Sequence, residues 1–287
     1  MSKITELKNW YLDKFKDFEN SLNGESKLPF HQTRIDAIQK FSDLNFPTIK
    51  DEEWKFTNIS SLLNHNFKPA SENVLEFDHS IIEKYLFDEK EYITIVFVNG
   101  VFSQKHSNIH SLGEGIVISN LKNAMVEHPE VIEKYLGKFA GYEKNIFTAL
   151  STAFAKEGTF IFVKENKIVE KPIQVLFVTS SNEEVFSSPR NLFVFGINSQ
   201  AKIIESYVGV SDKTSFTNAV TEVILEMGAV VEHVKVQDES ERAYHIARTE
   251  IDQERSSNYS SYNVNFGGTI VRNDLTTTFN DEYGFCK

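Results

Sequence analysis

The sequence has almost no cysteine, and this shortage excludes several kinds of protein. Cys286 is the only cysteine among 287 residues, so the chain has neither an intrachain disulfide framework nor a zinc site made of several thiolates. No stretch of about 18 consecutive apolar residues occurs, so we expect no membrane-spanning helix. The first residues alternate charged and apolar side chains and lack the apolar core of a signal peptide. We therefore expect a soluble, cytoplasmic protein.

Positive charge is also scarce. The chain carries 30 Lys and Arg against 41 Asp and Glu, a formal net charge of −11. A general nucleic-acid binder needs a cationic surface to displace counterions, and docking on anionic lipid needs one too, so we expect neither partner. Hydrophobic residues make up 40% and phenylalanines number 24, which is enough for a large core and favours sheet in much of the chain.

The sequence motifs of common enzyme families are absent. The chain has no phosphate-binding Gly-x-x-x-x-Gly-Lys-Ser/Thr loop and no Gly-x-Gly-x-x-Gly turn. It also lacks the Gly-x-Ser-x-Gly elbow of serine hydrolases and the His-Glu-x-x-His pair of zinc proteases. These absences argue against nucleotide hydrolysis and against the commoner hydrolase reactions.

The N-terminal part of the chain has the spacing of helices. Apolar residues recur every three or four positions over residues 7–18 and 32–41, which predicts two helices. A polar stretch follows, and we expect its Trp54 to be a buried anchor rather than a platform for stacking a ligand. We therefore assign residues 1–90 to an N-terminal helical region.

The pattern changes to short strands near residue 91. Residues 93–98 form an apolar run that ends at Asn99-Gly100, the pair most typical of a tight hairpin turn. Two helical patches predict an insert at about 121–156, which Pro129 interrupts. Short apolar runs bounded by polar residues then continue, so we assign residues 91–287 to a β-rich core.

A weak internal repeat indicates how these strands are arranged. Segments beginning at Gln200, Gly228 and Gly268 each have a small residue second and aliphatic residues around the fourth position. A spacing of roughly 20 to 50 residues between short strands is typical of a solenoid, in which equivalent side chains stack on neighbouring coils. An antiparallel sandwich also has evenly spaced short strands, so the pattern by itself leaves both folds open.

Two histidines are candidate metal ligands. His233 and His245 lie on successive predicted strands near Glu232, Gln237 and Glu250, and imidazole and carboxylate suit several divalent metals. The alternative is that these side chains lie on the exposed face of a coil, because residues alternate between the two faces of a strand.

A thiol and a group of carboxylates are the other candidates. Cys286 could ligate iron or accept sulfur, but it lies one residue from the end of the sequence. Glu222, Glu226 and Glu232 could form a carboxylate pair like those that cleave polysaccharides. We favour a solvated acidic face for these glutamates, in keeping with the net charge.

Several segments together resemble the SufB/SufD family of the SUF iron–sulfur cluster assembly system, and its SufD branch in particular. Their order and spacing match the family from about residue 47 to residue 279, and together they are far more specific than any one alone. The segments are Asp51-Glu-Glu-Trp-Lys-Phe-Thr, Leu150-Ser-Thr-Ala-Phe-Ala-Lys-Glu-Gly-Thr-Phe-Ile-Phe-Val with Lys171-Pro-Ile-Gln-Val-Leu, Pro189-Arg-Asn-Leu with Ala201-Lys-Ile-Ile-Glu-Ser-Tyr, Asn218-Ala-Val-Thr-Glu-Val with Gly228-Ala-Val-Val-Glu-His-Val-Lys-Val-Gln, and Gly267-Gly-Thr-Ile-Val-Arg-Asn-Asp-Leu.

The resemblance implies a mostly β fold, in which a right-handed parallel β-helix core follows an N-terminal α-helical region. It implies a non-catalytic scaffold subunit that pairs with a SufB-like paralogue, works with a SufC-like ATPase, and supports cluster assembly and iron entry. It also implies that this chain binds no cofactor itself, while the full complex holds an iron–sulfur cluster transiently. We carry over no catalytic, cofactor-binding or metal-binding residue.

The last residues depart from the family. Members continue beyond the segment at 267–275 with more coils and a helical segment that binds the ATPase, whereas Tyr283-Gly-Phe-Cys-Lys follows here. We therefore expect a truncated chain without that docking segment and without the family's cluster-proximal histidine. An uncapped last coil exposes apolar side chains and backbone edges, so we expect self-association, or association with the paralogue, near Val271 and Leu275.

Two other function classes compete with the scaffold subunit. The first is a β-helix enzyme that acts on polysaccharide, which needs a groove with converging carboxylates. The second is a structural solenoid without chemistry, in which the segments around Trp54 and Arg190 would have no counterpart.

Overall fold

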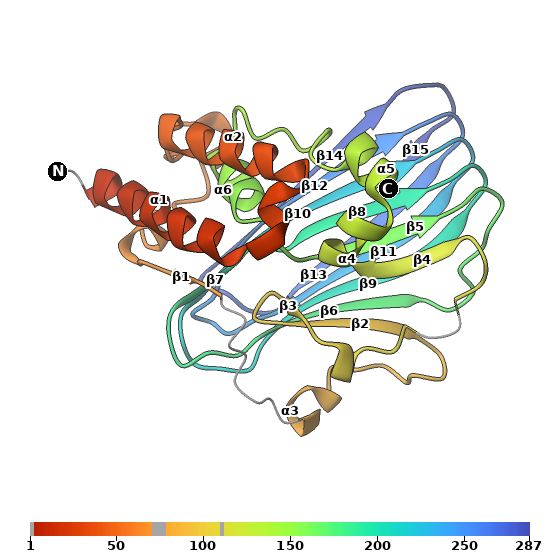
Figure 1. The fold of residues 1–287 in the computed structure, drawn as a ribbon, viewed down its shortest axis with the longest axis horizontal. Helices are drawn as coiled ribbons and strands as arrows, with labels where there is room; N and C mark the ends of the chain where they lie inside the picture. Colours follow the sequence, from red (N-terminus) through yellow and green to blue (C-terminus); the bar gives the residue numbers. More distant parts are fainter. Residues whose placement is uncertain (1–2, 71–78, 110–111) are drawn as a thin grey trace.

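The computed structural model describes residues 3–70, 79–109 and 112–287, in which a two-sheet β-solenoid carries helices on its outer surface (Figure 1). The helices, with the short 3-10 turns named η, are α1 (Lys3–Ser21), η1 (Asn23–Lys27), α2 (Phe30–Asp43), η2 (Glu52–Trp54), η3 (Leu62–Asn64), α3 (His79–Glu83), η4 (Gln104–His106), α4 (Leu121–Glu127), α5 (Pro129–Tyr135) and α6 (Ile146–Ala153).

The strands begin before α3 and dominate the second half of the chain. They are β1 (Lys68–Pro69), β2 (Ile93–Val98), β3 (Val101–Phe102), β4 (Ile116–Asn120), β5 (Thr159–Val163), β6 (Ile173–Thr179), β7 (Val185–Ser187), β8 (Arg190–Phe195), β9 (Gln200–Gly209), β10 (Ser215–Leu225), β11 (Val230–Asp238), β12 (Tyr244–Gln253), β13 (Asn258–Asn265), β14 (Ile270–Phe279) and β15 (Phe285–Cys286).

The chain alternates between two sheets from β6 onward. Sheet A contains β8, β10, β12 and β14, with β5 and β4 beyond β8 and with the short β7 and β1 beside β10. Sheet B runs in the order β15-β13-β11-β9-β6-β2-β3. Strands of successive coils pair in parallel in both sheets, which confirms the parallel β-helix and excludes the antiparallel sandwich.

The register gives the length of one coil. Gln200 pairs with Val230, so a coil of sheet B takes 30 residues there, two more than the spacing of the repeat segments. Val230 pairs in turn with Asn258, and this coil takes 28 residues. Directly paired residues of neighbouring strands point to the same face of a sheet, so this register keeps inward positions above inward positions from coil to coil.

The third repeat segment does not lie where the repeat predicts it. Ile203 and Val231 both face the interior from sheet B, where they are 1% exposed. Val271, however, lies on β14 in sheet A and pairs with His245. Aligning the repeat segments predicts that Val271 stacks on Val231; this prediction is wrong, because Tyr259 of β13 pairs with Val231. The short aliphatic pattern recurs on strands of both sheets, so its sequence match did not distinguish them.

Aromatic side chains attach the N-terminal helices to sheet A. Tyr11 of α1 lies with its ring centroid 5.7 Å from that of Phe41 in α2 and 5.8 Å from that of Phe186 in β7. Phe154, which follows α6, meets Phe186 edge-on at 5.6 Å. Buried aromatic rings remove large apolar areas from water, so this layer dominates the attachment. The two predicted helices are confirmed as α1 and α2.

The helical insert is divided where the proline predicts. α4 ends at Glu127, and Pro129 occupies the first turn of α5, where its missing N–H costs no hydrogen bond. The side chain of Asn120 accepts a hydrogen bond from the backbone N–H of Asn123, which caps α4 at 2.8 Å. Asn145 caps α6 in the same way.

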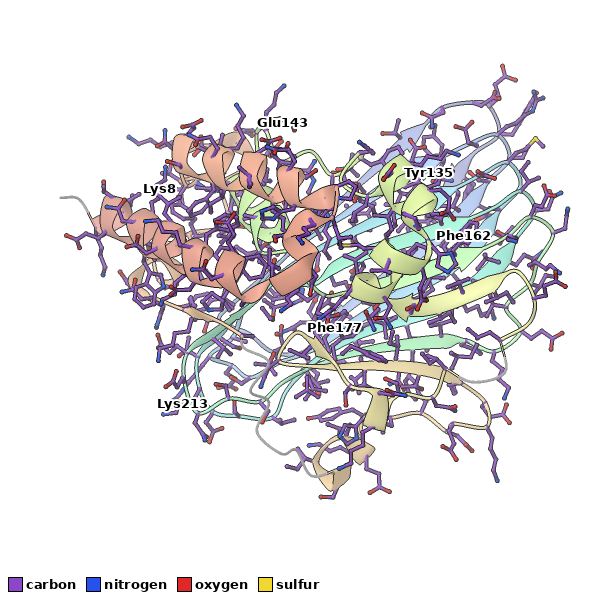
Figure 2. All side chains as sticks on the ribbon, in the orientation of Figure 1. Lys8, Tyr135, Glu143, Phe162, Phe177 and Lys213 are labelled. Atoms are coloured by element: carbon purple, nitrogen blue, oxygen red, sulfur yellow. The ribbon has the colours of Figure 1, made fainter. Side chains whose placement is uncertain are left out.

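The predicted hairpin between β2 and β3 is also confirmed. Asn99 and Gly100 both have positive φ, 50° and 76°, as a two-residue turn between twisted strands requires. Side chains fill the solenoid around Phe177, whereas Lys213 lies exposed on a turn (Figure 2). Over the described ranges, the structure contains no helix with the length and apolar character needed to cross a membrane.

Candidate functional site

The interior of the solenoid changes from apolar to polar along its axis. Positions that are aliphatic or aromatic on β6 carry acidic, basic, amide or hydroxyl groups one or two coils later. Three columns of paired, inward-facing residues on β6, β9, β11 and β13 show the change: Ile173-Ile203-His233-Ser261, Val175-Glu205-Lys235-Asn263, and Phe177-Tyr207-Gln237-Asn265.

Glu205 is the centre of a first polar cluster. Its Oε2 lies 3.0 Å from Nε2 of His233, and its Oε1 lies 3.9 Å from Nζ of Lys235 and accepts a hydrogen bond from the hydroxyl of Tyr207. Nδ1 of His233 lies 2.7 Å from the hydroxyl of Tyr259. All five side chains belong to residues that are 5% exposed or less, so they interact with one another instead of with water.

The neighbouring charges decide the protonation of this cluster. Burial raises the pKa of Glu205, but Lys235 and His233 outweigh burial and bring that pKa down to about 2. Burial lowers the pKa of Lys235, and the charge of Glu205 opposes this. Burial, together with the charge of Glu205, raises the pKa of Tyr207 and of Tyr259 well above the usual value. Near neutral pH, Glu205 is therefore a carboxylate and both phenols are neutral.

Glu239 organises a second cluster beside the first. Its Oε2 lies 2.8 Å from Nδ1 of His245 and accepts a hydrogen bond from Nε2 of Gln237 at 3.2 Å, while its Oε1 accepts one from Thr217 at 2.6 Å. Burial raises the pKa of Glu239, but His245 and the hydrogen bonds outweigh it and lower the pKa. The rings of Tyr207 and His245 meet edge-on at 4.8 Å, which joins the two clusters.

The arrangement is suited to holding protons and positioning side chains. His233 bridges a carboxylate and a phenol, and such partners fix the tautomer and orientation of an imidazole. Most of the polar atoms face other protein groups instead of a surface groove. Nε2 of His245 is an exception, since it is buried and has no hydrogen-bond partner among the described residues.

The exposed position considered for the two histidines is wrong. His233 and His245 are 3% and 0% exposed and point inward from different sheets, each beside its own carboxylate. Glu232 lies exposed on the opposite face of β11, because neighbouring residues of a strand alternate. Gln237 and His245 meet at Glu239, whereas His233, Glu232 and Glu250 each have other surroundings. No group of three or more His, Cys, Asp or Glu within the described ranges is placed to hold a metal ion.

Glu222 belongs to a buried ion pair, so the predicted solvated acidic face is wrong for this residue. Its Oε2 accepts a hydrogen bond from Nη2 of Arg190 at 2.8 Å, and both side chains are fully buried. The same carboxylate accepts hydrogen bonds from the backbone N–H groups of Gly137, Phe139 and Ala140 at 2.8–2.9 Å. A buried charge is tolerated when it is paired and fully hydrogen-bonded, so Glu222 fastens the helical insert to sheet A.

The other two glutamates lie elsewhere. Glu226 accepts a hydrogen bond from the hydroxyl of Tyr135 at 3.2 Å, whereas Glu232 faces solvent from sheet B. Glu222, Glu226 and Glu232 therefore have separate surroundings and do not form the converging carboxylate pair that glycoside hydrolysis requires.

Cys286 lies on β15, where it pairs with Tyr259 of β13. The thiol is half-buried and packs against the apolar core, and burial raises its pKa. A raised pKa reduces the fraction of thiolate, which is the form that ligates metal and attacks sulfur. This position therefore gives the thiol no activation.

The expected anchor role of Trp54 is confirmed. Trp54 is 6% exposed, and the centroid of its tilted ring lies 5.3 Å from the ring centroid of Phe147. The guanidinium of Arg272 also lies over the Trp54 ring, 3.9 Å from its centroid, and donates a hydrogen bond to the backbone oxygen of Glu53. The segment around Trp54 thus joins the helical region to β14. Phe56, two residues later, is 94% exposed.

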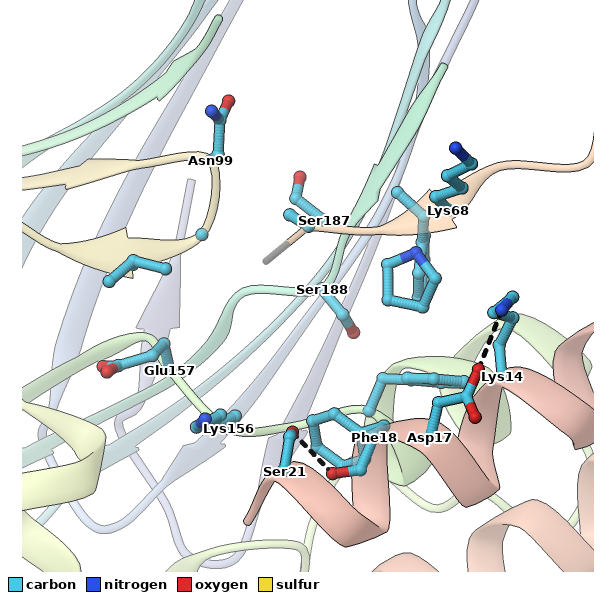
Figure 3. A pocket seen from close by; sticks show the side chains of 16 residues that line it. Lys14, Asp17, Phe18, Ser21, Lys68, Asn99, Lys156, Glu157, Ser187 and Ser188 are labelled. Carbon is cyan, nitrogen blue, oxygen red and sulfur yellow. Dashed lines mark hydrogen bonds and ion pairs between the residues drawn. The ribbon is translucent and has the colours of Figure 1, made fainter. Parts of the chain in front are cut away.

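A surface groove of about 440 Å³ lies between the end of α1, the β2–β3 turn and β7 (Figure 3). The polar groups along it are used locally: Lys14 pairs with Asp17 at 2.8 Å, and Ser188 donates a hydrogen bond to the backbone oxygen of Ser151. The side-chain oxygen of Asn99 accepts a hydrogen bond from the backbone N–H of Ser180. The groove therefore has no converging nucleophile, base and oxyanion donor among these groups.

Sequence reasoning missed the carboxylates that partner the histidines. Glu205 and Glu239 lie 28 and 6 positions from His233 and His245, and coil stacking or a turn brings each pair together. One signal was present: on β11, valines alternate with His233, Lys235 and Gln237. That alternation predicts the strand correctly. Valines usually mark the buried face of a strand, however, so the pattern by itself favours the wrong face of β11.

Two family models match consecutive parts of the chain. The model described as the SufBD protein N-terminal region matches residues 5–175. The model described as the SufBD core domain of SUF-system iron–sulfur cluster assembly matches residues 177–287. The first model alone covers more than half of the chain.

Curated relatives carry matching descriptions. An iron–sulfur cluster assembly SufBD family protein of Synechocystis sp. is 31% identical over 259 residues, which cover 87% of this chain and 56% of the relative. The iron–sulfur cluster assembly protein SufD of Escherichia coli is 23% identical over 248 residues, covering 85% and 55%. SufD of Bacillus subtilis is 27% identical over 212 residues, covering 71% and 47%. The chain spans about half the length of these relatives.

Proposed function

This chain belongs to the SufBD family of iron–sulfur cluster assembly proteins, and from this premise we propose that it is a scaffold subunit of a SUF assembly complex. The observation that carries the proposal is the match to both family models in their order along the chain. The description of the core model names the SUF system, and two of the relatives are named SufD.

A scaffold role, without turnover of its own, agrees with the state of the buried polar groups. Glu205 and Glu239 are each bound by a histidine and by hydroxyl or amide donors of the same chain. Glu222 is likewise saturated by Arg190 and by backbone N–H groups. Groups already paired in this way position coils and helices, whereas a catalytic acid or base must face its substrate. We therefore propose that the chain is not an enzyme.

We propose a SufB-like paralogue and a SufC-like ATPase as its partners. β14 lies at the edge of sheet A and offers main-chain groups for pairing with another strand. Two inward positions on β14, Leu275 and Phe279, are 40% and 47% exposed. Within the described residues this edge has no further strand beside it, and we propose that a strand of the paralogue pairs with it.

We further propose that the iron–sulfur cluster is held by the assembled complex and that this chain supports iron entry without retaining a cofactor. The lone thiol has a raised pKa, and a cluster needs several ligands in fixed geometry. In this proposal, the buried clusters around Glu205 and Glu239 stabilise the coils and fix the arrangement of their side chains.

Co-purification tests this function. A tagged chain is co-expressed with the SufB-like and SufC-like proteins of the same organism, and the complex is isolated and reconstituted anaerobically with iron and sulfide. We expect all three proteins to co-purify and the complex to show cluster absorption that the chain alone does not. A chain that retains neither protein under these conditions would contradict the proposal.

A matched pair of variants sharpens this test. Leu275→Lys places a charge on the inward face of β14, whereas Thr278→Lys places one on its outward face. We expect the first change to weaken retention of the paralogue and the second to leave it close to wild type. Equal retention by both variants would remove the β14 edge from the proposal but leave the scaffold role.

A further inference from the structure

We propose that the outer face of sheet B is a docking surface for an amphipathic α-helix of another protein chain. The surface, called the outer patch below, consists of Ile204, Val234, Val236, Tyr262 and Val264 on β9, β11 and β13. Tyr262 and Val264 are 43% and 38% exposed, and the other three are partly exposed. Contiguous apolar side chains on a surface mark an interaction site more often than isolated ones do.

The outer patch exists because β11 inverts the usual arrangement of a strand. His233, Lys235 and Gln237 occupy the inward positions, so Val234 and Val236 must face outward. A fold with no use for an apolar outer face would place valines inside and polar residues outside. The inversion satisfies two requirements at once, a polar interior and an apolar exterior.

Strand pairing makes the outer patch continuous. Val234 lies between Ile204 and Tyr262, and Val236 lies between Ser206 and Val264. Neighbouring strands are about 4.8 Å apart, and successive outward residues of one strand are about 7 Å apart. The two rows therefore form one strip, and a helix about 10 Å across covers both.

The upstream half of the same sheet face is already covered by a short helical segment. Leu176 lies in the row of Val236, and it packs with Ile82 of α3 in one buried cluster, where each is 0% exposed. Gln174, in the row of Val234, donates a hydrogen bond to the backbone oxygen of Tyr85 at 2.6 Å. Figure 1 places α3 beside β2 and β6, away from α1 and α2. A helix is thus the kind of element that fits these rows.

Size and charge favour a helix over a second copy of this chain. A stable homodimer buries about 800 Å² on each partner, more than five partly covered side chains expose. Lys202 and Glu232 are paired neighbours at one border of the patch and offset each other's charge. Asp238 at the other border pairs with Val208 and is exposed. We therefore infer that the bound helix places a lysine or arginine toward Asp238.

Photo-crosslinking in the producing cells tests the inference. The photoreactive residue p-benzoylphenylalanine replaces Val234 or Tyr262 in the full chain, and cross-linked peptides are identified by mass spectrometry. We expect cross-links to one segment of another protein, at residues spaced three or four apart and flanked by lysine or arginine. Cross-links to a second copy of this chain, cross-links to residues at alternate positions, or no cross-links from either site would each overturn the inference.

Two substitutions on one strand provide the matched control. Val234→Lys lies within the outer patch, whereas Val230→Lys faces outward on the same strand beyond the charged row of Lys202 and Glu232. We expect Val234→Lys to lower the yield of the cross-link from Tyr262 at least about tenfold and Val230→Lys to leave it within about twofold. A thermal melt of each variant verifies folding. Equal yields from both folded variants would overturn the inference.

The outer patch stands apart from the scaffold role. The cross-links identify a helix whatever protein carries it, whereas the co-purification above depends on the SUF partners. Failure of one experiment therefore leaves the other proposal intact. Asp238→Lys gives a third measurement, with an expected loss of about two- to fivefold in cross-link yield, because a border charge contributes less than the apolar centre.

Discussion

The first and the later coils of the solenoid share one backbone plan, but the later interior adds charged and hydrogen-bonding side chains to the apolar core. Val175 and Phe177 of β6 face Phe193 and other apolar residues, whereas Lys235 and Gln237 of β11 occupy the equivalent inward positions two coils on. Both regions are buried, and both have complete parallel pairing. Backbone pairing between strands therefore defines the coil. The interior tolerates polar side chains where their hydrogen-bond and ion-pair partners are also buried.

The two interiors are stabilised by different effects. The early coil gains from removing apolar area from water, about 25 cal/mol per Å². In the later coil, Glu205, Tyr207 and His233 lose their hydrogen bonds to water on folding and interact with one another instead. The net gain in folding free energy from such a replacement is small. We therefore expect the polar coil to define the arrangement of its side chains more than it adds to stability.

The largest effect is expected from a charge that has no partner. Val231→Asp buries a carboxylate two residues before His233 on the same inward face, where Val231 is 1% exposed. We expect a loss of more than about 4 kcal/mol in the free energy of unfolding, enough to prevent folding. Val230→Asp, one residue away and outward, is the control and should cost less than about 1 kcal/mol. Circular dichroism during urea unfolding measures both, and similar costs would contradict the assigned facing of β11.

A somewhat smaller effect is expected from removing one member of the polar coil. Glu205→Val restores the residue type of Val175 but leaves Lys235, His233 and Tyr207 without their carboxylate. We expect a loss of about 3 kcal/mol, because the remaining buried charge is uncompensated. Urea unfolding at pH 7 gives the value.

The double variant decides whether the coil can be converted into an apolar one. Glu205→Val combined with Lys235→Met removes both charges, and we expect it to be more stable than Glu205→Val alone. If the two changes instead add like independent losses, then Lys235 gains little from Glu205, and the ion pair does not explain why the polar coil is tolerated.

Acid should affect the polar coil and spare the apolar one. The folded pKa of Glu205, about 2, lies below the ordinary 4.5, so its stabilisation is complete above about pH 4.5 and is lost as the pH falls toward 2. Glu239 shifts in the same direction. We expect a loss of about 3 kcal/mol over this window in the wild type and a shallower loss in Glu205→Gln. The exposed Glu232→Gln variant should follow the wild type, and thermal melts across pH make the comparison.

The smallest effect is expected at the only thiol. Cys286→Ser should change the free energy of unfolding by less than about 0.5 kcal/mol, because Cys286 lies half-buried on a two-residue strand. Anaerobic addition of iron and sulfide to the isolated chain should give no cluster that survives desalting, with or without the substitution. A stoichiometric cluster that disappears in the variant would show that Cys286 is a ligand.

Local sequence was sufficient for most of the individual helices, strands and turns. The helices at 7–18 and 32–41, the hairpin at Asn99-Gly100 and the break at Pro129 all depend on spacing or backbone preference within a few residues. The coil arrangement required the family resemblance as well, because short strands alone fit a sandwich equally. The position of Val271 was wrong, since similar aliphatic patterns occur on both sheets.

The candidate site was much less accessible from sequence. His233 was singled out correctly as a notable residue, but its partners Glu205 and Tyr259 lie about one coil away on either side. Glu222 was assigned to solvent because an isolated glutamate usually is, and nothing near it in sequence indicates that Arg190 and the insert will surround it.

By itself, the sequence determined that β11 is a strand, since valines and polar residues alternate along it. Only the tertiary structure decided which of its faces is inside. Alternation has a period of two, and this period is the same whichever face of the strand is buried. The pattern therefore does not show which face is inside. The decision comes from the neighbouring coils: Glu205, Tyr207 and Tyr259 supply the partners that make His233 and Lys235 stable in the interior, and Val234 and Val236 are left on the surface.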